Sequence, residues 1–180
     1  MNLHDYWNNR ALNYDSHDVL GRNIVKGYLE KLKPRSLVEV GCGRGELFPL
    51  YGKIPRVVGL DFSENMLEYA KLRVERHGLS VELRHLDITR ESIAEKFDVA
   101  LTRTVLMHIR PEDIGKAALN VSLMSDRLLL FEYWEPIQTK PLASHNWLHD
   151  YVEVFTGLGY RLSDSYSRSD MPQVLFVFER

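Results

Sequence analysis

A short apolar segment that runs into three glycines is the part of this chain best suited to holding a ligand. Residues 36–40, Ser-Leu-Val-Glu-Val, have the pattern of a buried strand, and Gly-Cys-Gly-Arg-Gly follows at 41–45. A helix is expected over residues 46–53. Glycine lets the backbone turn sharply and approach a ligand closely. The strand, the glycine turn and the helix start together predict a nucleotide-type site at the carboxyl edge of a parallel sheet.

Acidic residues stand at the ends of the next two expected strands. Asp61 ends the strand at 56–61, about twenty residues beyond the glycine turn, where an acid can accept hydrogen bonds from both ribose hydroxyls. Asp87 follows the strand at 81–85. Each acid has a plainer alternative, because Asp61 could cap the helix that begins near Ser63 and Asp87 could cap a turn.

The glycine turn resembles the first motif of the class I S-adenosylmethionine-dependent methyltransferases. It departs from the dinucleotide pattern G-x-G-x-x-G, because Glu46 stands where that pattern has its last glycine. S-adenosylmethionine carries an amino group and a sulfonium in place of a pyrophosphate, and the acidic Glu39 beside the turn suits this charge. The glycine turn, Asp61, Asp87 and the segment 97–109 occur in the order of the family's motifs.

The resemblance implies a set of cofactor contacts. Phe62 and Met66 would pack against the adenine, Asp87 would accept a hydrogen bond from its amino group, and the Ile88 amide would face the ring. Judged alone, Phe62 and Met66 are typical core residues, and Cys42 is a small filler of the turn. The implied cofactor-binding residues are Tyr14, Glu39, Gly41, Cys42, Gly43, Asp61, Phe62, Met66, Asp87, Ile88 and Thr102.

The resemblance also implies where the methyl acceptor binds. Residues 6–15 resemble the lid helix of small-molecule methyltransferases, and the loops after the fourth and fifth strands would complete the acceptor pocket. Arg103 could pair with an acidic substrate group or with Glu132 or Glu135. The implied substrate-binding residues are Tyr6, Trp7, Arg10, Arg103 and Trp134.

The implied reaction is a direct displacement that needs little acid–base apparatus. Most of the rate would come from orienting the reactants and excluding water. His108 is the candidate catalytic base for a hydroxyl or ammonium acceptor, and a structural histidine is its alternative. His145 and His149 are expected on one face of a helix at 144–157, as surface residues, so we predict no metal site.

The order of strand and helix patterns predicts the fold class. Strands alternate with helices up to the last two strands, which lie near 160–166 and 173–179 and lack a helix between them. We therefore predict an α/β, Rossmann-like seven-stranded sheet, mostly parallel, with helices on both faces and an antiparallel C-terminal hairpin. Residues 1–34 would form an N-terminal helical lid segment, and 35–180 the S-adenosylmethionine-binding domain, within a single domain overall.

Composition and net charge indicate the expected partners and location of the chain. The net charge of -2 gives no electrostatic argument for a nucleic-acid partner, and no apolar run is long enough for a membrane span. A single cysteine and the absence of a signal-peptide pattern favour a cytoplasmic location. The short connection at 136–143 leaves an acceptor site that is either open or completed by a second subunit, as in a homo-oligomer.

The predicted function is methyl transfer from S-adenosylmethionine to an oxygen or nitrogen of a small-molecule acceptor. Three alternatives remain: a methyltransferase acting on protein or RNA, a non-catalytic cofactor-binding subunit, and a dinucleotide-dependent oxidoreductase. Fold alone does not separate them.

Overall fold

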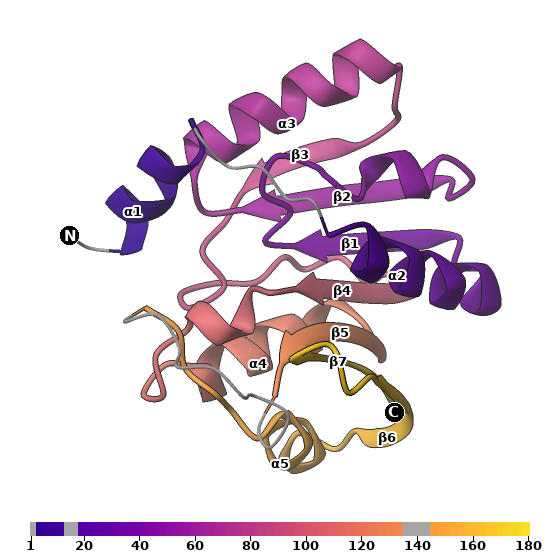
Figure 1. Ribbon diagram of the computed structural model, residues 1–180, viewed down its shortest axis with the longest axis vertical. Coiled ribbons are helices and arrows are strands. Elements are labelled where there is room, and N and C mark those ends of the chain that lie inside the picture. The colour runs from indigo at the N-terminus through magenta and orange to yellow at the C-terminus, as the bar shows by residue number, and fades with distance from the viewer. Residues whose placement is uncertain (1–2, 13–17, 135–144) are drawn as a thin grey trace. The chain divides into compact units, whose positions relative to one another are not determined.

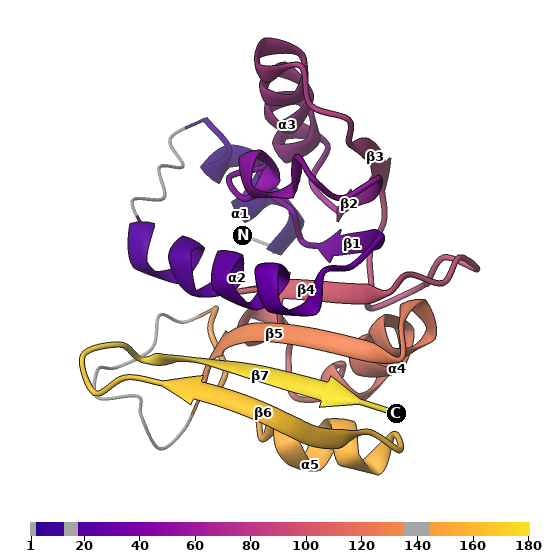
Figure 2. The same ribbon diagram turned by 90° about the vertical axis from the view of Figure 1, so that its right-hand side faces the viewer.

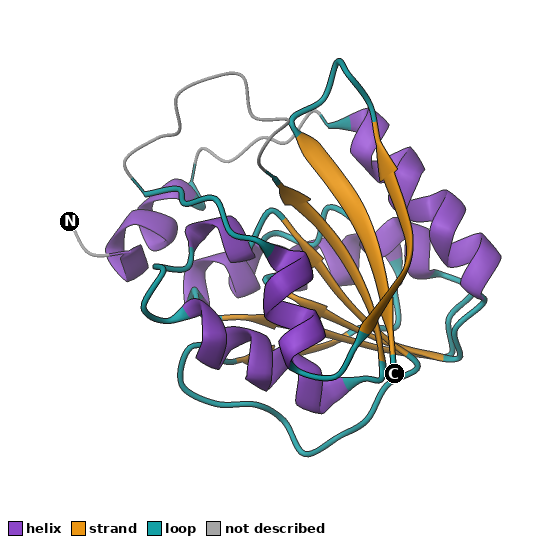
Figure 3. Ribbon diagram, turned by 90° about the horizontal axis from the view of Figure 1, so that it is seen from below, coloured by secondary structure: helices purple, strands orange, loops and turns teal. Residues whose placement is uncertain are grey.

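A computed structural model describes residues 3–12, 18–134 and 145–180. Its elements fall into two units, Met1–Asp87 and Ile88–Arg180 (Figure 1). The strands belong to a seven-stranded sheet with the order β3-β2-β1-β4-β5-β7-β6. Figure 3 distinguishes the helices, strands and connecting loops by colour. The predicted Rossmann-like fold class is confirmed by this mostly parallel sheet and its antiparallel end.

The first unit is built around three parallel strands. β1 pairs with β2 and β2 with β3, so Val38 lies opposite Val58 and Leu60 opposite Arg84. Parallel pairing brings the loops that follow these strands to one edge of the sheet. The elements of the unit are α1 (Leu3–Arg10), α2 (Val19–Leu32), β1 (Ser36–Val40), the 3₁₀ turn η1 (Phe48–Tyr51), β2 (Arg56–Asp61), α3 (Glu64–His77) and β3 (Glu82–His85).

Local sequence explains where the two long helices of this unit begin and end. The Asp18 carboxylate accepts a hydrogen bond from the Gly21 amide at 2.7 Å and caps α2. Ser63 caps α3 in the same way, and Gly78 ends that helix in the left-handed conformation. The N-cap of α3 thus lies two residues beyond Asp61, which leaves the Asp61 carboxylate for other contacts.

The prediction of a helix over residues 46–53 is wrong. The structure has only the 3₁₀ turn η1 there, from Phe48 to Tyr51. Pro49 has no amide hydrogen to donate, and Gly52 follows at the end of the turn, so little favours continuation of a helix. The short turn buries Phe48 and Tyr51 instead.

The second unit continues the parallel pattern and closes it with an antiparallel hairpin. β4 pairs in parallel with β5, whereas β5 with β7 and β7 with β6 are antiparallel (Figure 2). Leu128, Leu129 and Leu130 are fully buried, as predicted for a central strand covered on both faces. The elements are β4 (Val99–Arg103), the 3₁₀ turn η2 (Leu106–His108), α4 (Ile114–Met124), β5 (Arg127–Tyr133), α5 (Tyr151–Gly157), β6 (Arg161–Ser167) and β7 (Gln173–Glu179).

The start of α5 corrects a second expectation. A helix was predicted from residue 144, but α5 begins at Tyr151, and residues 145–150 are not helical. The Asp150 carboxylate accepts a hydrogen bond from the Glu153 amide at 2.9 Å and fixes the helix start. His145 and His149 therefore precede the helix and do not share a helical face.

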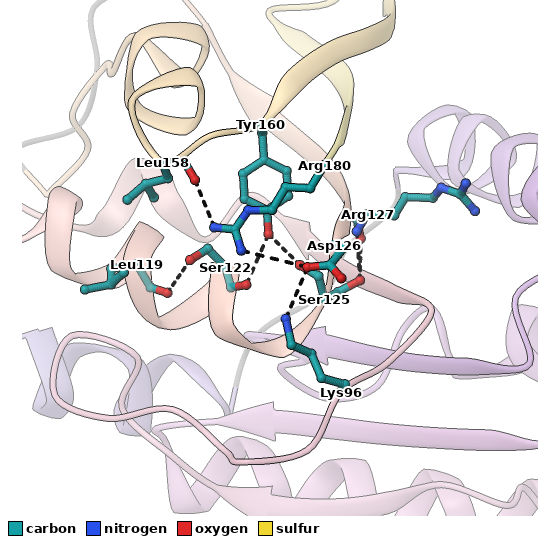
Figure 4. A network of polar contacts seen from close by, with 9 residues as sticks. All are labelled: Lys96, Leu119, Ser122, Ser125, Asp126, Arg127, Leu158, Tyr160 and Arg180. Carbon is teal, nitrogen blue, oxygen red and sulfur yellow. Dashed lines mark hydrogen bonds and ion pairs between the residues drawn. The ribbon is translucent and has the colours of Figure 1, made fainter.

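Within the second unit, a network of polar contacts holds the C-terminal residue Arg180 (Figure 4). The Arg180 guanidinium lies 4.3 Å from the centre of the Tyr160 ring and donates a hydrogen bond to the Leu158 carbonyl at 2.9 Å. The Tyr160 hydroxyl donates to the carbonyls of Ser122 and Ser125. The network thus joins the end of β7, the turn before β6 and the turn between α4 and β5.

Candidate functional site

The glycine turn after β1 has a backbone that needs its glycines. Gly43 has φ +54° and Gly45 has φ +73°, both in the left-handed region. A side chain at Gly45 would also overlap the ring of Phe48. Cys42 of the same turn is buried, and burial raises the pKa of its thiol well above the usual range. The thiol therefore stays neutral and fills space, in line with the packing interpretation of Cys42.

Asp61 joins the end of β2 to this glycine turn. Its Oδ2 accepts a hydrogen bond from the Gly43 amide at 2.8 Å, and its Oδ1 accepts one from the Ser63 amide at 2.9 Å. Burial raises the pKa of Asp61 to about 6 despite both bonds. The acid predicted to bind ribose is thus part of the glycine turn's own hydrogen bonding, and a carboxylate has more acceptor sites than these bonds use.

Glu39 lies at the base of the same turn. It is buried, and its Oε2 accepts a hydrogen bond from the Tyr51 hydroxyl at 2.9 Å. Tyr51 belongs to η1, so this bond holds the segment after the glycine turn against β1. Its predicted role at the methionine end of the cofactor stays a prediction.

The helix α3 braces the glycine turn from another direction. Arg73 donates a hydrogen bond to the Arg44 carbonyl at 2.9 Å. The Arg44 guanidinium in turn lies 4.2 Å from the centre of the Tyr69 ring. The turn is therefore held by β2 through Asp61 and by α3 through Arg73 and Tyr69. Such preorganisation suits a ligand cradle, because little order is lost on binding.

The N-terminal helix α1 is attached to the start of α3 by Asn8. The Ser63 hydroxyl donates to Asn8 Oδ1 at 2.6 Å, and the Asn65 side chain donates to the Asn8 carbonyl at 3.0 Å. Phe62 and Met66 flank this contact, with Phe62 half-buried and Met66 buried. Sequence reasoning missed Asn8, because its partners are more than fifty residues away.

The predicted acceptor residues of α1 lie in the first unit. Tyr6 and Trp7 pack edge to face, with ring centres 5.1 Å apart, and Arg10 is exposed at the end of the helix. Tyr14 lies outside the described residues. The aromatic pair is compatible with both interpretations of this helix, a lid and a packing element.

The two residues predicted to contact the adenine, Asp87 and Ile88, belong to different units. Asp87, the last residue of the first unit, is half-buried after β3. Ile88, the first residue of the second unit, is buried, and its carbonyl accepts a hydrogen bond from the Asn120 side chain at 2.7 Å. Asn120 of α4 is thus a support for this segment that the sequence did not reveal. The adenine contacts of Asp87 and Ile88 stay predictions.

Thr102 and Glu132 form a buried polar pair at the ends of β4 and β5. Thr102 is fully buried, and its hydroxyl donates to Glu132 Oε1 at 2.8 Å. Glu132 also accepts hydrogen bonds from two backbone amides of the loop after β4, those of Val105 and Met107. The cofactor contact predicted for Thr102 would therefore fall to its backbone.

His108 ends η2 in the loop after β4. Its Nδ1 lies 3.4 Å from the His145 carbonyl, and the two rings stack with centres 5.6 Å apart. Burial lowers the pKa of His108 to about 4, so the ring is neutral near pH 7. Because a carbonyl can only accept, this contact assigns the proton to Nδ1 and leaves the lone pair on Nε2.

Two further aromatic residues of the second unit are held by packing. Trp134 packs edge to face on Phe176 with ring centres 5.5 Å apart. His149 was expected at the surface, but it is buried and its Nε2 lies 2.9 Å from the Ile109 carbonyl.

Among the described residues, no group of three or more His, Cys, Asp or Glu could hold a metal ion. No helix within the described ranges is long and apolar enough to span a membrane.

Parallel strands, a glycine turn in the left-handed conformation and an acid at the next strand end define a Rossmann-like α/β protein with a nucleotide-type cradle. Residues 37–123 match the family model described as a methyltransferase domain. A ubiquinone biosynthesis O-methyltransferase of Ruegeria pomeroyi is 36% identical over 77 residues, which are 41% of this chain and 30% of that protein. An uncharacterised protein of Haemophilus influenzae is 28% identical over 147 residues, 77% of this chain and 57% of its own length.

The fold comparison agrees with the sequence comparison. The magnesium protoporphyrin IX methyltransferase of Synechocystis, solved with bound SAH, superposes with a TM-score of 0.79 over 99% of this chain and 98% of that chain, at 18% identity. In the sequence of residues 37–123 and in its fold, this chain is thus similar to S-adenosylmethionine-dependent methyltransferases, and this similarity supports the predicted family, enzyme class and cofactor. The chain spans only 57% and 30% of the two relatives' lengths.

Proposed function

We propose that this chain transfers a methyl group from S-adenosylmethionine to an oxygen or nitrogen of a small-molecule acceptor. The observation that carries the proposal is the bond between Asp61 and the Gly43 amide, which unites the two cofactor motifs in one rigid cradle. The relative from Ruegeria pomeroyi is named as an O-methyltransferase of ubiquinone biosynthesis, which supports a small acceptor.

The donor supplies an electrophilic methyl group on a sulfonium, and this chain supplies binding, orientation and proton acceptance. Asp61 would hold the ribose, and the glycine turn would hold the methionine end. Both are already fixed by hydrogen bonds within the first unit. Orientation of this kind accounts for much of the rate in a displacement reaction.

His108 would accept a proton from the acceptor through Nε2. With a pKa of about 4, it is a weak base that is always ready to accept near neutral pH. Such a neutral base suits an acceptor that still carries its proton near pH 7, such as a phenol or an alkylammonium ion, whereas a carboxylic acid is already ionised there and needs no base.

The test begins with calorimetric titration by S-adenosylmethionine and, separately, by nicotinamide dinucleotides. We expect binding of S-adenosylmethionine alone. Release of S-adenosylhomocysteine is then measured with phenols, carboxylic acids and amines as acceptors. Turnover of a small acceptor supports the proposal. Binding without turnover of any acceptor would instead favour a non-catalytic cofactor-binding subunit, and preference for a dinucleotide would reject the proposed site.

A further inference from the structure

Glu132, near the end of β5, is a buried acid to which the proposed function gives no task. Its side chain has no exposed surface. The carboxylate accepts hydrogen bonds from the Thr102 hydroxyl at 2.8 Å and from the Val105 amide at 3.0 and 3.1 Å, with the Met107 amide at 3.4 Å. A buried carboxylate is costly unless such donors surround it, so this arrangement calls for an explanation.

The amides that Glu132 binds belong to the loop that carries His108. This loop begins with Thr104 in the left-handed region at φ +53°, a strained conformation for a residue other than glycine. The turn η2 follows, and its N-cap residue Val105 has no side-chain hydrogen bond to cap it. Glu132 supplies from the neighbouring strand the acceptor that η2 lacks in its own sequence.

The opposite side of the loop is held by the segment before α5. The Trp147 amide donates to the Met107 carbonyl at 2.7 Å, and His149 Nε2 lies 2.9 Å from the Ile109 carbonyl. The Val105 and Met107 amides thus donate to Glu132, whereas the Met107 and Ile109 carbonyls contact residues 147–149. His108 lies between these two sets of contacts.

We propose that Glu132 is a positioning residue for methyl transfer, which fixes the loop after β4 so that His108 is presented in one orientation. This inference rests on the proposed function. Glu132 acts through the backbone of Val105 and Met107, and it need not touch donor or acceptor. The Tyr151 hydroxyl faces the same acid. That hydroxyl is buried and has no hydrogen-bond partner in the described part of the chain, so it does not compete for the loop amides.

The decisive variant is Glu132→Gln. Glutamine keeps one acceptor oxygen for the loop. Removal of the buried charge favours folding, whereas an NH2 group turned toward a loop amide opposes it, so the protein should remain folded. We expect kcat to fall about tenfold, because a loop with half its acceptors holds the base less well. The dissociation constant for S-adenosylmethionine should stay within about twofold of wild type. Glu153→Gln makes the same chemical change at an exposed site and should alter none of these values.

A merely structural role would lower stability and activity together, whereas a positioning role separates them. Wild-type kcat in Glu132→Gln overturns the inference. Loss of cofactor affinity in parallel with kcat also overturns it, because that would place Glu132 in the cofactor site or the general fold.

Amide hydrogen exchange provides a readout that does not depend on turnover. The Val105 and Met107 amides of the wild type should be protected relative to the exposed Glu112 amide, and Glu132→Gln should lose protection at both. Exchange that is fast in wild type, or unchanged in the variant, contradicts the hold on the loop. A wild-type protein that methylates no acceptor rejects the proposed function, and the exchange result then still decides whether Glu132 fixes the loop.

Discussion

Replacing Asp61 should weaken S-adenosylmethionine binding while leaving the protein folded. The carboxylate is held by the Gly43 and Ser63 amides at 2.8 and 2.9 Å, and a carboxylate has further acceptor capacity for a ribose hydroxyl. Asp61→Ala removes these acceptors and loosens the glycine turn. Asp61→Asn keeps the shape and one acceptor oxygen, so it separates the effect of charge from the effect of space.

The magnitude follows from the hydrogen bonds and from the pKa. Hydrogen bonds to a charged group are worth about 1 to 3 kcal/mol, so the dissociation constant should rise by roughly 5- to 150-fold in Asp61→Ala and less in Asp61→Asn. Burial raises the pKa of Asp61 from 3.8 to about 6, which corresponds to about 3 kcal/mol of destabilisation of the ionised form at neutral pH. Asp61→Asn removes this cost but turns an NH2 group toward the Gly43 or the Ser63 amide, so we expect it to stay folded while it binds cofactor less tightly.

The sign of the pH dependence can be worked out from the same pKa. Because the folded pKa lies above the ordinary value of 3.8, the contribution of Asp61 to the unfolding free energy falls as pH rises from about 4 to about 6. Cofactor binding has the opposite trend, because ribose hydroxyls donate to the ionised carboxylate. The wild-type dissociation constant should be about tenfold higher at pH 5 than at pH 7.

Isothermal titration at pH 5 and pH 7, with thermal unfolding of the free protein, tests these points together. Asp113→Asn is the matched control, because the Asp113 side chain makes no capping hydrogen bond on α4. Cofactor affinity within about twofold of wild type in folded Asp61→Ala would refute the ribose role. Affinity that does not change with pH in wild type would refute the assignment of the charge.

Three further predictions concern the glycine turn, the base and the C-terminus. Gly45→Ala should lower the unfolding free energy by about 1–3 kcal/mol, because Gly45 has a positive φ and an added side chain would overlap Phe48. Gly52→Ala is the control, because Gly52 has open space around it, and it should not lower the unfolding free energy. Chemical denaturation compares the two variants. His108→Ala should reduce kcat by about 100-fold or more, with unchanged cofactor affinity by titration, and unchanged turnover would make His108 structural. Arg180→Ala should cost about 1 kcal/mol of stability, measured by thermal unfolding, because it loses one aromatic contact, one hydrogen bond and the exposed ion pair with Asp126. Cofactor affinity should be unchanged, since these contacts are remote from the glycine turn in sequence.

The features that the sequence predicts well are those whose signal is local. The glycine turn, the N-cap at Ser63 and the apolar run of β5 each depend on neighbours within a few residues. The helix expected over 46–53 failed where two local signals conflicted, because Pro49 and Gly52 interrupt an otherwise apolar segment. The helix expected from residue 144 failed because its N-cap is Asp150, beyond the histidines whose spacing resembled a helical face.

The features that the sequence hides are contacts between distant residues. Asn8 meets Ser63 across 55 positions, and Glu132 meets Val105 across 27. Neither pair has a spacing that any periodic pattern would reveal. In the sequence, Glu132 is a single acid in an apolar strand. Only the pairing of β4 with β5 brings it to the amides of the loop after β4.

Asp61 in the first unit and Glu132 in the second make the same kind of contact with a neighbouring loop. Each acid is at or near the end of a strand, and each accepts a backbone amide from the loop that follows the parallel neighbour, which is β1 for Asp61 and β4 for Glu132. Burial raises both pKa values, to about 6 and about 7, so both acids bind their loops at some expense of stability. The two proposed roles differ in what a ligand should do to this balance. Cofactor hydroxyls that reach Asp61 would lower its pKa, whereas the pKa of Glu132, which meets only its own chain, should be unchanged by the cofactor.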